Sequence, residues 1–62
     1  MTTISFNAVE VNALRSQMKL CDEDLSFEDA RSILLRTGDS DLAMTALLLK
    51  PRPDWLRDLI GA

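Results

Sequence analysis

Three consecutive acids, Asp22, Glu23 and Asp24, are the residues of this sequence whose types most readily suggest chemistry. Hard cations such as Ca²⁺ and Mg²⁺ take several oxygen ligands, so a metal site is the first hypothesis that they raise. An EF-hand loop alternates its acids around a central glycine, and neither feature is present here. Asp39 and Asp41 could also ligate a cation, but their positions are better explained as the start of a helix. We therefore expect no metal site.

Cys21 is the other candidate for chemistry, because it is the one cysteine of the chain. A catalytic thiolate needs a nearby base, and the sequence contains no histidine. Cys21 continues the apolar spacing of the residues before it, so we expect it to be a small buried residue. A chain this short also has little volume for a pocket in which carboxylates could act as acid and base. The expectation is a protein that is not an enzyme and holds no cofactor.

The composition indicates one small globular domain spanning residues 1–62, with 47% apolar and 27% charged residues. A chain of this size buries only about 60% of its unfolded surface, and chains without disulfides or metals often gain stability by forming oligomers. The N-terminal residues lack the basic and apolar regions of a signal peptide. The longest nearly apolar run, 42–49, is much shorter than the roughly 20 residues that span a bilayer. We expect a cytoplasmic protein without membrane association.

Cap and breaker residues divide the chain into four expected helices, at about 7–21, 26–37, 40–50 and 53–60. Asn7 and Ser26 are good N-cap residues, and each is followed three positions later by an acid. Gly38 is expected to end the second helix in the left-handed conformation. Pro51 should stop the third helix, and Pro53 should open the fourth. The expected fold class is all-α, with a compact three-helix bundle and a short fourth helix at the C-terminal end.

The spacing of apolar residues predicts which sides of the first two helices are buried. In the first helix a 3-4-3 spacing gives a buried face made of Val11, Leu14, Met18 and Cys21. Its polar residues are expected in solvent, namely Asn12, Arg15, Ser16 and Lys19. In the second helix the side expected to be buried consists of Phe27, Ala30, Ile33 and Leu34, and Leu35 could extend it. Before the first helix, Ile4 and Phe6 could fold onto the core from a short extended arm.

The third helix is unusual, because seven of the eight residues from Leu42 to Leu49 are apolar. A helix that is apolar on all sides is either buried on all sides or has a second partner. A chain of 62 residues has little protein with which to surround it. We therefore expect a binding surface on the third and fourth helices, with five anchor residues: Leu42, Met44, Leu48, Trp55 and Leu59. Homodimerisation through this surface is expected.

The formal net charge of −3 is concentrated in the middle of the chain, where residues 22–41 carry seven acids and two arginines. Helix capping does not explain Asp22, Glu23 and Asp24, so we expect them to select a basic partner surface. The second and third helices could also be interpreted as a helix-turn-helix motif. The third helix offers no arginine, asparagine or glutamine before Lys50, and acids lie at its start. DNA binding is therefore not expected.

Residues 26–48 resemble the second half of a ubiquitin-associated (UBA) or UBA-like domain. Such domains place an alanine early in helix two and end that helix with Thr-Gly. The next helix has a central alanine and ends with two consecutive leucines. The matching residues are Ala30, Thr37, Gly38, Ala43, Leu47 and Leu48. The Met-Gly-Phe/Tyr loop of the family has its nearest counterpart in 18–20, which lacks the glycine. The resemblance implies a compact three-helix fold that binds protein partners.

These expectations favour a non-enzymatic protein–protein interaction module, a small accessory or regulatory protein that self-associates or binds a partner through an apolar helical surface. A bacterial or phage accessory protein is compatible with the residues. Two alternatives stay open: a UBA-like domain that binds ubiquitin, and a regulator that binds or mimics nucleic acid.

Overall fold

The computed structural model describes residues 6–61, which contain four α-helices and no strand. The helices are α1 (Ala8–Leu20), α2 (Phe27–Thr37), α3 (Ser40–Leu48) and α4 (Asp54–Ile60). The all-helical expectation is confirmed, and every helix starts within one residue of its predicted start. Phe6 packs partly buried against the core as expected, whereas Ile4 lies outside the described residues.

Local capping explains where the first three helices begin. The side chains of Asn7, Ser26 and Asp39 each accept a hydrogen bond from a backbone N–H of the first turn, at 2.9, 3.1 and 2.8 Å. Each bond satisfies a donor that has no partner within the helix. The fourth helix begins directly after Pro53, which has no side-chain cap bond.

The observed ends of the helices agree less well with the prediction than their starts do. Gly38 ends α2 in the left-handed conformation with φ 74°, as expected. The prediction that α3 extends to residue 50 is wrong, because the helix ends at Leu48 and Leu49 is extended. Lys50 precedes a proline, whose ring disfavours helical backbone in the residue before it. This accounts for Lys50, and the chain leaves α3 one residue before it, at Leu49.

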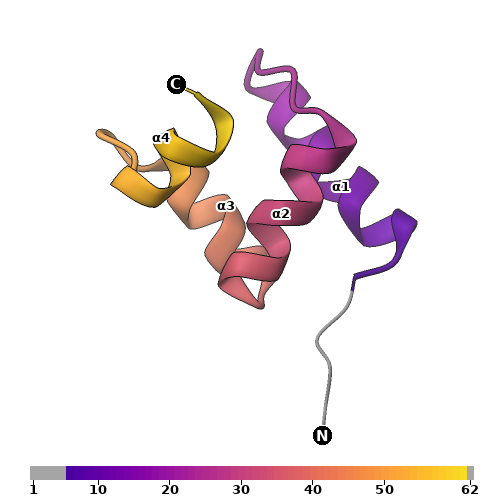
Figure 1. Cartoon of the computed structure of the whole chain (residues 1–62). Coiled ribbons are helices and arrows are strands. Elements are labelled where there is room, and N and C mark those ends of the chain that lie inside the picture. The colour runs from indigo at the N-terminus through magenta and orange to yellow at the C-terminus, as the bar shows by residue number, and fades with distance from the viewer. Residues whose placement is uncertain (1–5, 62) are drawn as a thin grey trace, which may run out of the picture.

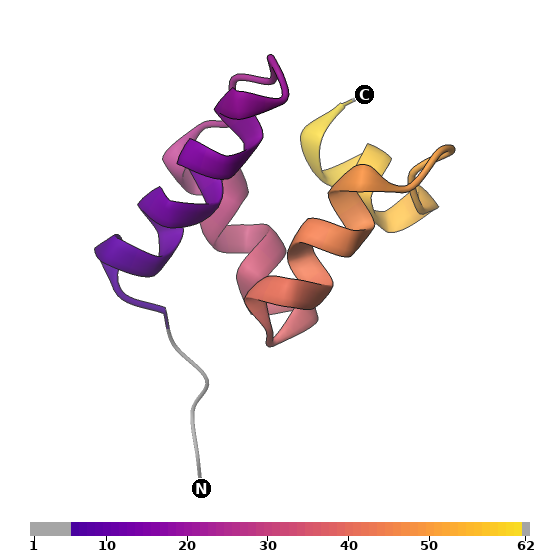
Figure 2. The ribbon, with the colours of Figure 1, turned by 180° about the vertical axis from the view of Figure 1, so that it is seen from behind.

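The four helices are arranged around α2, which contacts each of the other three (Figure 1). The α1 helix also contacts α3, and the view from behind shows α1 on one side of α2 and the α3–α4 pair on the other (Figure 2). The radius of gyration of 11.0 Å is that of a compact chain of this length. None of the helices within 6–61 is long and apolar enough to cross a membrane.

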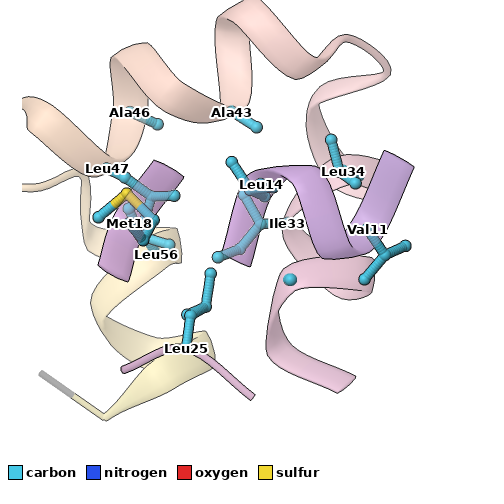
Figure 3. Close-up of a cluster of buried hydrophobic side chains, with 11 residues drawn as sticks. Val11, Leu14, Met18, Leu25, Ile33, Leu34, Ala43, Ala46, Leu47 and Leu56 are labelled. Carbon is cyan, nitrogen blue, oxygen red and sulfur yellow. The ribbon is translucent and has the colours of Figure 1, made fainter. Parts of the chain in front are cut away.

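The hydrophobic core takes side chains from all four helices and from the loop before α2 (Figure 3). Its buried members are Val11, Leu14, Met18, Leu25, Ala30, Ile33, Leu34, Ala43, Ala46, Leu47 and Leu56. No buried side-chain nitrogen or oxygen within the described range lacks a hydrogen-bond partner. The core is therefore almost purely apolar, and its stability comes from packing.

Three residues expected in the core lie at its edge or outside it. Cys21 is exposed, because α1 ends at Leu20 and Cys21 already belongs to the turn that follows. Leu25 takes its place in the core. Phe27 and Leu35 are 36% and 41% exposed, since Phe27 stands at the first position of α2 and Leu35 points away from the buried stripe.

The turn after α1 gives Asp22 a structural role. Asp22 has φ 61°, and its N–H donates to the carbonyl of Lys19 at 3.0 Å. The N–H of Glu23 donates to the carbonyl of Met18 at 3.0 Å. These two bonds form a Schellman motif with Asp22 in the left-handed position that glycine usually occupies. The expectation that capping does not explain Asp22 is therefore wrong, because its backbone closes the end of α1.

The variant Asp22→Gly is expected to raise the free energy of unfolding by about 0.5–1 kcal/mol, because glycine adopts positive φ without the steric cost of a Cβ. Urea denaturation followed by circular dichroism measures this change. Asp24→Gly is the control. Asp22 is the only non-glycine residue of 6–61 with positive φ, so glycine at position 24 relieves no strain and only makes the unfolded chain more flexible. A less stable Asp22→Gly protein would contradict the assignment.

Candidate functional site

The outward side of α3 is apolar and uncovered. The helix buries Ala43, Ala46 and Leu47, which face the core. Leu42, Leu48 and Leu49 are 55%, 54% and 48% exposed. Large aliphatic side chains gain about 1.5–3 kcal/mol each when they are fully buried, so this side retains unused binding energy. As the sequence indicated, a single chain does not cover this helix.

Part of this side forms a shallow depression with the start of α4, which we call the α3–α4 surface. It is lined by Leu42, Thr45, Ala46, Leu49, Pro53 and Trp55, together with Arg36 and Thr37 from the end of α2. The spacing of Leu42, Thr45 and Leu49 places these three side chains along one line of α3. Pro53 and Trp55 contribute the α4 side of the same depression.

A cation and an aromatic ring meet in the α3–α4 surface. The guanidinium carbon of Arg36 lies 5.5 Å from the centroid of the Trp55 ring, within the range of a cation–π interaction. Arg36 is the one charged residue that lines the depression, so no carboxylate among the described residues opposes it there. The surface therefore combines aliphatic, aromatic and guanidinium groups at a single place.

The structure brings together only some of the five predicted anchors. Leu42 and Trp55 both line the α3–α4 surface. Met44 is partly buried and lines a separate depression against α1, and Leu59 packs partly buried on the core. Leu48 is exposed, but six residues at 100° each turn it about 120° around the helix from Leu42.

Three residues of the surface were missed from the sequence: Arg36, Leu49 and Pro53. Leu49 could have been found, because it follows Leu42 by seven residues and therefore lies on the same side of α3. Pro53 and Arg36 join the surface through the path of the chain between α3 and α4 and through the packing of α2. Sequence spacing carries no information on either.

The acidic loop has a further structural contact. The Arg52 guanidinium forms an ion pair with Glu23, and Arg52 Nε donates to the carbonyl of Leu47 at 3.0 Å. The side chains of Arg52 and Glu23 are only 18% and 32% exposed. Arg52 therefore ties the loop after α1 to the end of α3. Of the three acids, Asp24 is the one that is exposed and takes no part in the helix cap or the ion pair, so a role in recognition stays a prediction.

Arg15 holds the same loop from the other side. Its Nε donates to the carbonyl of Leu25 at 2.8 Å, and Nη1 donates to Asn12 Oδ1 at 3.0 Å. The expectation that Arg15 is solvated is wrong, because the side chain is half-buried against the incoming chain. Two arginine contacts thus anchor the loop in a chain without a disulfide.

The described part of the chain contains no group of three or more histidine, cysteine or acidic residues placed to hold a metal ion. No protein-family model matches this chain, and no curated protein or solved structure is detectably similar to it. The geometry of the α3–α4 surface is accordingly the feature that supports a function.

Proposed function

We propose that this protein is a non-enzymatic protein-interaction module, a small accessory or regulatory protein, and that the α3–α4 surface is its binding surface. One observation carries the proposal: Leu42 and Leu49, each about half exposed, lie in one depression with Trp55. Tryptophan and arginine are enriched among the residues that dominate interface energetics, and both are present here. An exposed apolar patch with a polar rim is typical of a protein-binding site.

The packing of the helices supports a three-helix bundle of α1, α2 and α3, with α4 attached through α2. In that arrangement α4 supplies Pro53 and Trp55 to the surface and buries Leu56 in the core. The UBA resemblance implies the same three-helix unit. Residues 18–20 are the counterpart of the Met-Gly-Phe/Tyr loop of UBA domains. The side chain of Met18 is only 1% exposed, so the geometry favours binding through the α3–α4 surface over ubiquitin binding through residues 18–20.

A protein partner fits the charges better than a nucleic acid does. Arg15 and Arg52 donate to carbonyl groups of the chain itself, and Arg36 lies over Trp55. Arg57 pairs with Asp54. Nucleic-acid binding draws much of its affinity from cations that reach phosphates, and four of the seven cations of the chain are engaged within the molecule.

Photo-crosslinking tests the proposal through two matched leucines. Leu42 and Leu48 belong to the same helix and are 55% and 54% exposed, but only Leu42 lines the α3–α4 surface. Benzoylphenylalanine is placed at either position, and the two proteins are irradiated in the native host. We expect crosslinks to a protein, whether a second copy or a different chain, mainly from position 42. Equal yields from both positions would overturn the proposal.

A further inference from the structure

We propose that the α3–α4 surface binds a second copy of this chain, with the two α3 helices antiparallel across a twofold axis near Thr45 and Ala46. This inference rests on the proposed function, because it names the partner of the same surface. A twofold interface uses one patch twice, so the patch must be complementary to itself. The outward side of α3 meets that condition.

The residues of α3 and its C-cap that line the α3–α4 surface are arranged symmetrically about one point of the chain. Leu42 and Leu49 lie at equal distances from the midpoint between Thr45 and Ala46, and all four line the α3–α4 surface. In an antiparallel pair, Leu42 of one copy lies opposite Leu49 of the other. Thr45 is exposed at the midpoint, and Ala46 beside it is turned towards the core with 7% exposed, so no large side chain there holds the two helices apart. The larger leucines pack on either side.

The charges at the two ends of α3 select the same orientation. Asp41 lies in the first turn, and Lys50 follows the helix at its other end. Both residues are exposed, and neither forms an ion pair within the described residues. Neither residue lines the α3–α4 surface, and Asp41 borders the depression against α1, so both lie at the margin of the proposed interface. An antiparallel pair places the end of α3 that carries Asp41 level with the end that carries Lys50 in the second copy, and it also opposes the two helix dipoles. A parallel pair would place like charges together.

Sedimentation equilibrium of charge-reversed variants tests this arrangement. Wild type is expected to dimerise, and Asp41→Lys or Lys50→Asp alone should weaken the dimer about tenfold, since each reversal replaces two attractive pairs with repulsive ones. The variant with both reversals should regain the wild-type dissociation constant, because opposite charges meet again. The single-variant losses should shrink in high salt. Circular dichroism confirms that every variant is folded.

Disulfide trapping tests the orientation without changing a charge. In a Cys21→Ser background, Leu42→Cys and Leu49→Cys are prepared as separate proteins. The antiparallel pair brings position 42 of one copy to position 49 of the other, while equal positions stay about 10 Å apart along the axis at 1.5 Å per residue. A disulfide needs Cα atoms roughly 5.5–6 Å apart. The mixture should therefore oxidise to a mixed dimer, and each protein alone should not.

Each result decides one point. A monomer at millimolar concentration, with photo-crosslinks from position 42 to a different protein, would overturn the dimer and leave the proposed function standing. A dimer without charge rescue, or disulfides that form within each cysteine variant alone, would overturn the antiparallel arrangement. Rescue together with the mixed disulfide would support it.

Discussion

Leu56→Ala is expected to lower the free energy of unfolding by about 2–5 kcal/mol, because the substitution removes buried methyl groups and leaves a cavity. Leu56 is fully buried and is the only buried residue of α4. A helix of seven residues has little stability of its own, so α4 depends on this anchor. A domain of this length has a total stability of roughly 3–9 kcal/mol, and the variant would lose much of it.

Urea denaturation measures the loss, with circular dichroism for the helices and the fluorescence of Trp55, the single tryptophan, for α4. Leu48→Ala is the control, because Leu48 is 54% exposed and its truncation should change stability by no more than about 0.5 kcal/mol. If Leu56→Ala were as stable as Leu48→Ala, α4 would not be packed on the core, and the α4 side of the α3–α4 surface would be lost.

Arg52→Met is expected to cost about 1–3 kcal/mol, because it removes a charged donor from two acceptors that are largely shielded from water. The carbonyl of Leu47 would lose its bond from Arg52 Nε, and Glu23 would lose its ion-pair partner. The last turn of α3 contains no basic residue, so Arg52 also supplies the positive charge that favours a helix C-terminus. Methionine keeps most of the apolar stem, which limits the change to the polar contacts.

Arg57→Met is the matched control. Arg57 also forms an ion pair, with Asp54, but their side chains are 52% and 87% exposed. Exposed pairs contribute about 0–1 kcal/mol, so this variant should stay close to wild type. The two variants are compared by urea denaturation under identical conditions. Equal stabilities of Arg52→Met and Arg57→Met would show that the loop is not held by Arg52.

The starts of the helices could be predicted because their causes are local. Asn7, Ser26 and Asp39 are cap residues whose partners lie two or three positions away. The core residues of α1 and α2 followed from spacing for the same reason. The pattern failed at Cys21, because apolar spacing continued past the point where the left-handed turn at Asp22 ended the helix.

The contacts that hold the loop could not be predicted, because they join distant residues. Arg52 and Glu23 are 29 positions apart, and Arg15 and Leu25 are 10 apart. Similarly, α3 is so uniformly apolar that its sequence does not indicate which side meets the core. The sequence therefore groups Met44 and Leu48 with Leu42, although Leu42 is the one of these three that lines the same depression as Trp55.

The assignment of the α3–α4 surface as the binding surface is tested most directly by the ratio of photo-crosslinking yields from positions 42 and 48. The two leucines are equally exposed on one helix, so chance collisions should label both to the same extent. A specific partner on the α3–α4 surface predicts a discrete crosslinked protein from position 42 and a much weaker product from position 48. Yields that are equal, or higher from position 48, would contradict the assignment.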